Sequence, residues 1–200
     1  MYKVFNDNIP LILHSDIFYH GDTDNFLYIK YEEVDEWDYI FKTLWKNDGV
    51  EGLSVFSDNS STAWNEFKSK FKFVSAAGGI IHNEHDEILI IERNDRLDLP
   101  KGHIEKDELA KDAAIREVAE ECGLKHHKIT SNNPKVSYHI YSLDGQWVLK
   151  KTYWFTMIAS KDEVLIPQSE EGITNLYWLD KKMIDQRKDE FYSSLLDLLV

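Results

Sequence analysis

The sequence predicts an α/β protein, with a mixed sheet and flanking helices over residues 74–200 and a small α+β domain over residues 1–73. Strand-like apolar runs and segments of helical spacing follow one another along the chain. The dipeptide Asp144–Gly145, the strongest short hairpin signal, separates two of the longest runs. With 200 residues, 42% of them hydrophobic, the chain is long enough for one core and a small second one.

The first domain is expected to hold strands and two helices in about 70 residues, a size that is marginal alone. Its boundary lies near residues 73–79, where an aromatic-rich segment gives way to small residues. In order, the pattern predicts strands at Val4–Phe5, Leu11–Leu13 and Phe26–Ile29, a helix with Trp37, Phe41, Leu44 and Trp45, a strand at Gly52–Phe56, and a helix with Trp64, Phe67 and Phe71. No motif assigns this domain a role; a lid, base recognition and a dimer interface are the candidates.

The second domain is expected to follow the order βββαβββα. In order, the pattern predicts a hairpin of Ile80–Ile81 and Ile88–Ile91, a loop from Arg93 to Lys101, a helix from about Asp107 to Cys122, strands at Val136–Leu143, Trp147–Ile158 and Leu176–Leu179, and a C-terminal helix with Ile184, Phe191, Leu195, Leu198 and Leu199.

The net charge of −13 excludes several classes of function. A protein that binds a nucleic-acid backbone or an anionic membrane needs a basic patch, which this acidic composition does not favour. The single cysteine, Cys122, excludes an internal disulfide and fits a reducing compartment. No signal peptide is visible, and no apolar run approaches the roughly 18 residues of a membrane span. We therefore expect a soluble, cytoplasmic protein without nucleic-acid or membrane partners.

The predicted helix at 107–122 carries three glutamates, Glu117, Glu120 and Glu121, which fall together on a helical wheel. Three carboxylates without a lysine among them make a cluster of hard oxygen ligands, which suits Mg²⁺ or Mn²⁺ better than zinc. Arg116 precedes Glu120 by four residues and is placed to hold it. A solvated acidic face is the alternative interpretation of such a cluster.

The ends and the apolar face of this helix follow from the same stretch. Asp107 is expected to cap its N-terminus, and Gly123 is expected to end it. Ile115, Val118 and Cys122 form the predicted apolar face, nearly opposite the glutamates.

The spacing of residues around the helix matches a known family motif. Its fixed positions are Gly102, Glu108, Arg116, Glu117, Glu120, Glu121 and Gly123, with apolar Val118 and Leu124. At ordinary residue frequencies, seven such coincidences are on the order of a one-in-a-million event. The motif is the Nudix box, and the chain resembles a Nudix hydrolase. The resemblance implies an α/β/α sandwich over residues 74–200 and hydrolysis of a nucleoside diphosphate linked to another group, with Mg²⁺ or Mn²⁺.

The resemblance also implies roles for individual residues. The metal-binding set is Glu117, Glu120, Glu121 and the carbonyl of Lys101, and the catalytic set is Glu108, Arg116, Glu120 and Glu171. The wheel places Glu108 away from the other glutamates, so its role rests on the resemblance. Glu170 and Glu171 precede the last strand, where many family members carry an extra acid, and one of them is a candidate general base.

The form Pro-Lys-Gly-His at residues 100–103 resembles Nudix members that cut diadenosine polyphosphates and inositol pyrophosphates. Lys101, His103, Arg93 and Arg96 are candidate phosphate-binding residues, with solvated loop charges as the alternative. Tyr141 follows the box at a distance that resembles the diadenosine polyphosphate signature, in which the ring stacks on adenine. Its alternative is an ordinary strand aromatic.

A Mg²⁺-dependent pyrophosphohydrolase of a small nucleotide, such as a dinucleoside polyphosphate, is thus the leading hypothesis. An ADP-ribose or nucleotide-sugar pyrophosphatase is the alternative within the class. A ligand-sensing regulator built on a Nudix domain is the alternative from another class. The box is complete and no basic segment follows it, which disfavours the regulator. The resemblance also makes a homodimer an expectation.

Overall fold

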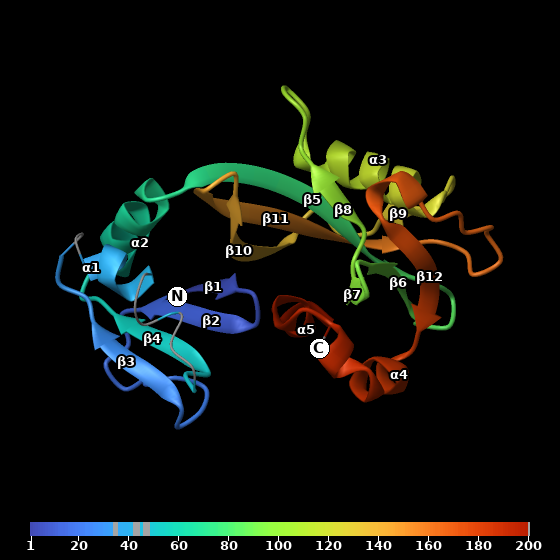
Figure 1. Cartoon of the computed structure of the whole chain (residues 1–200). Coiled ribbons are helices and arrows are strands. Elements are labelled where there is room, and N and C mark those ends of the chain that lie inside the picture. The colour runs from blue at the N-terminus through green and yellow to red at the C-terminus, as the bar shows by residue number, and fades with distance from the viewer. Residues whose placement is uncertain (34–35, 42–44, 46–48, 200) are drawn as a thin grey trace. The chain divides into compact units, whose positions relative to one another are not determined.

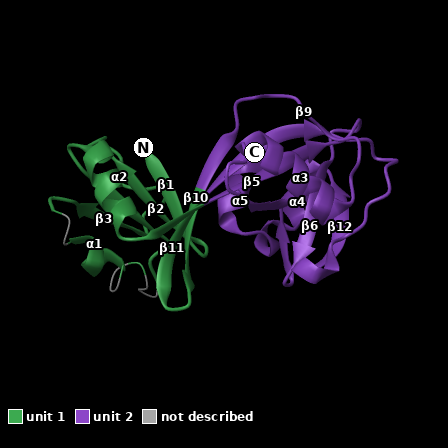
Figure 2. Cartoon of the chain, turned by 90° about the horizontal axis from the view of Figure 1, so that it is seen from above, with its two compact units in different colours: residues 1–74, 138–150 green, residues 75–137, 151–200 purple. Residues whose placement is uncertain are grey.

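The computed structural model describes residues 1–33, 36–41, 45 and 49–199, and the chain divides into two compact units (Figures 1 and 2). Unit 1 comprises residues 1–74 and 138–150, and unit 2 comprises residues 75–137 and 151–200. The sequence pattern predicts a single boundary after residue 73. The structure differs in the arm 138–150, which joins unit 1 because its strand pairs in parallel with the first strand of the chain.

Unit 1 contains a mixed sheet with antiparallel and parallel pairs. Its elements are β1 (Tyr2–Asn6), β2 (Ile9–His14), β3 (Phe26–Lys30), α1 (Glu36–Tyr39), β4 (Gly52–Phe56) and α2 (Ser60–Ser69), with parts of β10 (Lys135–Leu143) and β11 (Gln146–Ile158). β1 pairs antiparallel with β2, β2 and β3 both pair in parallel with β4, and β1 pairs in parallel with β10. Buried aromatic residues of α1 and α2 cover this sheet and form its core.

The structure describes only part of the first predicted helix. α1 ends at Tyr39, and Ile40 and Phe41 continue as a wider π-type turn. The Trp45 N–H donates to the Ile40 carbonyl, five residues earlier, at 2.9 Å. Leu44 lies outside the described residues. Of the apolar residues of this predicted helix, Trp37 and Trp45 are buried and Phe41 is partly buried.

Unit 2 holds the remaining elements in one layered arrangement. They are most of β5 (Lys72–His82), β6 (Ile88–Arg93), β7 (Arg96–Asp98), β8 (Lys101–His103), α3 (Ala110–Cys122), β9 (Lys128–Ile129), the other parts of β10 and β11, the 3₁₀ turns η2 (Ser169–Glu171) and η3 (Lys188–Glu190), β12 (Ile173–Leu179), α4 (Lys181–Gln186) and α5 (Ser193–Leu199). The predicted hairpins are confirmed: β6 pairs antiparallel with β5, and Asp144 and Gly145, both with positive φ, join β10 to β11.

Two hydrophobic layers cover the sheet of unit 2. α3 packs Ala113, Ala114 and Val118 against Ala77 and Phe155, among other sheet residues. α4 and α5 belong to a second cluster, which also contains Ile80 of β5, Ile88 and Ile90 of β6, and Trp154 of β11. Unit 2 therefore has the α/β/α layering that the sequence predicts.

The C-terminal helix predicted as one element is two. Asp180 caps α4 by accepting a hydrogen bond from the Met183 N–H at 2.7 Å. The chain then turns through η3 and extends at Phe191, which forms an isolated parallel bridge with Leu97. The apolar residues keep helical spacing across this break between α4 and α5 because both helices bury residues in the same cluster. Within the described part of the chain, no helix is long and apolar enough to cross a membrane.

Candidate functional site

The helix that carries the glutamates begins later than the sequence predicts. α3 starts at Ala110, and the capping position is Leu109, which has extended backbone angles and no capping side chain. Asp107, the expected N-cap, instead has a φ of 66° in the turn before the helix. Glu108 accordingly stands outside the helix, and its carboxylate accepts a hydrogen bond from the Glu105 N–H at 2.9 Å. The helical wheel did not apply to Glu108.

The two faces of α3 also differ from the wheel. Glu117 and Glu121 are 9% and 1% exposed, so they belong to the buried side with Val118 and Cys122. Ile115, expected in the apolar face, is 39% exposed. Two carboxylates are thus removed from water, a state that carries a free-energy cost unless cations or hydrogen bonds compensate it.

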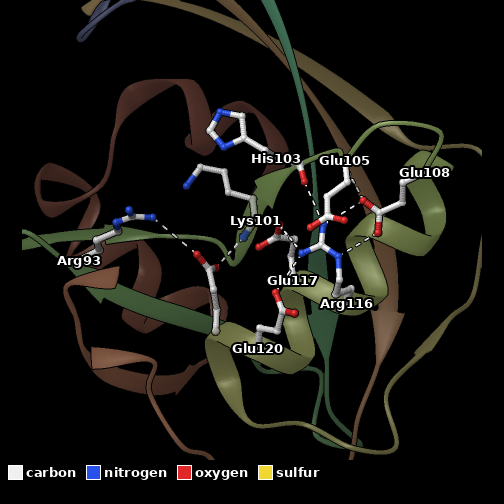
Figure 3. Close-up of polar contacts among 9 residues, drawn as sticks. Arg93, Lys101, His103, Glu105, Glu108, Arg116, Glu117 and Glu120 are labelled. Atoms are coloured by element: carbon white, nitrogen blue, oxygen red, sulfur yellow. Dashed lines mark hydrogen bonds and ion pairs between the residues drawn. The ribbon is translucent and has the colours of Figure 1, made fainter. Parts of the chain in front are cut away.

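Arg116 links three of the carboxylates (Figure 3). Its Nε and Nη2 donate to both oxygens of Glu108 at 2.9 Å, which makes a bidentate pair. Its Nη1 donates to Glu117 at 2.8 Å and to Glu120 at 2.9 Å. The guanidinium lowers the pKa of Glu108 to about 2. Arg116 therefore brings Glu108 to the other glutamates, which sequence spacing alone did not.

Gly102, a residue of the sheet, leaves room for the Glu117 carboxylate. Its strand β8 pairs with β5, where Gly102 lies opposite Ala77. A Cβ built on Gly102 would overlap the carboxylate of Glu117. Glycine is needed here for close approach and not for an unusual φ. Burial raises the pKa of Glu117, and Arg116 opposes that effect.

Glu121 is the most deeply buried carboxylate of the cluster. The backbone N–H of Lys101 donates to its Oε2 at 2.7 Å, and Arg93 Nη1 lies 3.6 Å from its Oε1. That Oε1 is buried without a hydrogen-bond partner among the described residues. Burial raises the pKa of Glu121 to about 7. A partly compensated carboxylate oxygen of this kind is a ready ligand for a cation.

Arg93 connects Glu121 to the turn before β12. Its Nη2 lies 3.2 Å from Glu171 Oε2, and both Glu170 and Glu171 are exposed. The structure thus brings Glu171, which the sequence could not choose over Glu170, to the edge of the cluster. Arg96 is engaged elsewhere: its Nη2 donates to the Phe191 carbonyl at 2.8 Å.

The Lys101 ammonium donates a hydrogen bond to Asp98, a carboxylate that the sequence pattern did not indicate. Asp98 is 6% exposed; its Oδ2 accepts from Lys101 Nζ at 2.5 Å and its Oδ1 from the Leu99 N–H at 2.7 Å. The sequence signal was an acid three residues before a lysine. In a loop this spacing carries no structural implication, so Asp98 was missed.

The two other expected substrate residues lie in different surroundings. His103 is exposed at the end of β8, and its carbonyl accepts from Arg116 Nη2 at 3.0 Å. Tyr141 belongs to unit 1, where Lys150 Nζ lies 5.2 Å from its ring centroid.

Arginine side chains pair with the carboxylates of the site. Among the described residues, no group of three or more His, Cys, Asp or Glu side chains is arranged to hold a metal ion. Arg116 stands between Glu117 and Glu120, and Arg93 stands between Glu121 and Glu171. Each of these guanidinium groups therefore joins carboxylates of the site to one another.

Comparison with known proteins agrees with the site. A family model described as the NUDIX domain matches residues 72–199, which is more than half of the chain. The chain belongs to the NUDIX domain family. The matched range contains α3 and every residue of the carboxylate cluster.

Two curated relatives of this NUDIX chain are from Saccharomyces cerevisiae, an mRNA-decapping enzyme subunit 2 and an m7GpppN-mRNA hydrolase. Each is 30% identical over 129 residues. The match covers 62% of this chain but 12% of the relatives' length. Among solved structures, a C. elegans Ap4A hydrolase binary complex has a TM-score of 0.49 at 20% identity, covering 62% of this chain and 89% of that one. The MutT protein of Methanosarcina mazei Go1 has a TM-score of 0.47 at 18% identity, covering 65% and 92%.

Proposed function

We propose that this NUDIX chain is a Mg²⁺- or Mn²⁺-dependent hydrolase that cleaves a phosphoanhydride bond in a nucleoside diphosphate linked to a further group. The observation that carries the proposal is the buried pair Glu117 and Glu121, held by Arg116 and by the Lys101 N–H. Burying two neighbouring carboxylates costs desolvation free energy, and a bound divalent cation would offset that cost.

The residues present fit a hard divalent cation. All candidate ligands are oxygens, and Glu121 Oε1 has no hydrogen-bond partner among the described residues. Glu117 and Glu121 would hold the ion, with Glu120 and the Lys101 carbonyl assisting. When bound, the ion would neutralise charge on a diphosphate and act as a Lewis acid on it.

The chain's own residues supply positioning and a proton acceptor. Arg116 fixes the rotamers of Glu117 and Glu120, and Gly102 leaves the space in which the Glu117 carboxylate lies. Arg93, whose Nη1 lies 3.6 Å from Glu121, would bind a phosphate oxygen of the substrate. Glu171, which lies 3.2 Å from Arg93, would accept a proton from the attacking water.

We expect the Glu171→Gln variant to lower kcat by about 10²–10³-fold with a nearly unchanged KM, because a glutamine accepts no proton. Glu170→Gln is the matched control, because Glu170 is its exposed neighbour and should keep wild-type kcat. Initial rates at saturating Mg²⁺ make the comparison. Equal kcat values for the two variants would remove Glu171 from the mechanism.

A dinucleoside polyphosphate is the substrate we propose first. Lys101 and His103 in the Pro-Lys-Gly-His segment and Arg93 in β6 place cationic or donor groups beside the carboxylates, which suits a phosphate chain of several units. Capped nucleotides are the second candidate, because the curated relatives include an m7GpppN-mRNA hydrolase.

A product-resolved screen tests the substrate. Diadenosine tetraphosphate, ADP-ribose, a nucleotide sugar and an m7GpppN-capped RNA are each incubated with the full chain and Mg²⁺, and the products are separated by chromatography. We expect the fastest turnover with diadenosine tetraphosphate. Faster turnover of another compound would reassign the substrate. Tight binding of a nucleotide without turnover of any of the four would favour the regulator.

A further inference from the structure

Asp98 is a buried carboxylate that the proposed mechanism does not use. It is the last residue of β7, just before the short connection to β8, and both of its oxygens accept hydrogen bonds. One bond goes to the backbone of the next residue, Leu99, and the other goes to the Lys101 ammonium. Buried ion pairs of this kind rarely add much stability, because desolvation offsets the attraction. The role of the Asp98–Lys101 pair is therefore better inferred from its position than from its contribution to stability.

Lys101 contacts the cluster with its backbone while its side chain is held elsewhere. Its N–H donates to Glu121 Oε2 at 2.7 Å, and its Nζ bonds to Asp98 at 2.5 Å. A lysine ammonium reaches about 6 Å from its own Cα, so rotation of the side chain alone would bring it to the same carboxylate. The Lys101 charge already favours the ionised form of Glu121, as its effect on the pKa of that group indicates.

A free ammonium beside Glu121 would compete with a cation. Glu121 Oε1 lacks a hydrogen-bond partner among the described residues, and Arg93 approaches it no closer than 3.6 Å. A lysine that formed an ion pair there would give this oxygen a partner. An incoming divalent ion would then have to displace a second positive charge in addition to Arg93.

We propose that Asp98 is a positioning residue that holds the Lys101 ammonium away from Glu121 and so keeps Glu121 Oε1 open to the divalent cation. This inference rests on the proposed function, since it concerns the same metal site. It predicts that Asp98 acts through Lys101 and not merely as part of the loop scaffold.

Mn²⁺ binding to the purified full chain, followed by electron paramagnetic resonance of the free ion, tests the inference without any substrate. We expect Asp98→Asn to weaken Mn²⁺ binding by about 10-fold or more, the size typical of residues that orient metal ligands. Adding Lys101→Met to that variant removes the competing ammonium. The double variant should return to within about 2-fold of wild type, because the deletions interact through one contact.

Two controls make the result specific. Asp95→Asn removes the same charge from the exposed end of the loop and should leave Mn²⁺ binding unchanged. Lys101→Met alone leaves Asp98 uncompensated, so it should bind Mn²⁺ at least as tightly as wild type. This single variant keeps the test open if Asp98→Asn does not fold, which thermal unfolding of each variant shows.

Each outcome decides between two claims. Wild-type binding by Asp98→Asn, no recovery in the double variant, or weaker binding by Lys101→Met would overturn the role of Asp98 while leaving the metal site in place. No Mn²⁺ binding by the wild-type chain would instead overturn the metal assignment in the proposed function, and the inference about Asp98 with it.

Discussion

Replacing Glu121 by glutamine is expected to reduce kcat by roughly 10³-fold, which is several kcal/mol of transition-state stabilisation. Glutamine keeps the shape and still accepts the hydrogen bond from the Lys101 N–H. It removes the charge that would hold a divalent ion, so the fold survives and the reaction does not. Initial rates across a Mg²⁺ titration measure the effect. Wild-type turnover at saturating Mg²⁺ would show that Glu121 is not a metal ligand.

The same variant is expected to be more stable than wild type when metal is removed at high pH. A glutamate in the unfolded chain titrates near about 4.3, and burial raises the pKa of Glu121 to about 7 in the folded chain. Folding is therefore penalised as the pH rises between these values, by about 4 kcal/mol once both states are ionised. The penalty persists above pH 7 and is absent from Glu121→Gln.

Thermal unfolding in EDTA at pH 5 and pH 8 checks this expectation. The variant should exceed wild type by several degrees at pH 8, and the difference should narrow at pH 5. Adding Mg²⁺ at pH 8 should stabilise wild type and not the variant. An equal Tm for both proteins at pH 8 in EDTA would contradict the description of Glu121 as a buried, incompletely compensated carboxylate.

Gly102→Ala is expected to lower kcat by at least about 10²-fold with a modest loss of stability. The new Cβ would overlap the Glu117 carboxylate, which is the end of a flexible side chain and can move aside. Displacing a group of the site by about 1 Å is enough for a loss of this size, while the strain of the added methyl costs about 1–3 kcal/mol. Turnover and chemical denaturation measure the two effects separately.

Combining Gly102→Ala with Glu117→Ala identifies which contact causes the loss of stability. If the carboxylate is what the methyl strikes, Gly102→Ala should cost no stability in a chain that already carries Glu117→Ala. An undiminished cost in that background would mean that the strand β8, and not Glu117, is disturbed.

Local patterns in the sequence predicted most of the elements because each has a short-range cause. The Asp144–Gly145 turn supplies positive φ at both positions, and Gly123 ends α3 in the left-handed conformation. The elements that differ are those set by packing. The C-terminal helix, for example, is divided where Phe191 extends to pair with Leu97.

The same distinction between local features and features set by packing applies to the candidate site. The box gave the residue types and their order, since spacing on one helix is local. The wheel could not show that Glu117 and Glu121 are buried, because strand β8 and its loop cover them. The contacts of Arg93 with Glu171 and of Lys101 with Asp98 join residues from separate elements or from a loop. Only the folded chain defines such contacts.

The most direct test of the account is ³¹P NMR of diadenosine tetraphosphate incubated with the full chain. We predict conversion to smaller nucleotides with Mg²⁺, none with EDTA, and none with a chain carrying both Glu117→Gln and Glu121→Gln. Conversion that continues in EDTA, or that the double variant supports at the wild-type rate, would contradict the claim that these two buried carboxylates hold the ion that cleaves a phosphoanhydride.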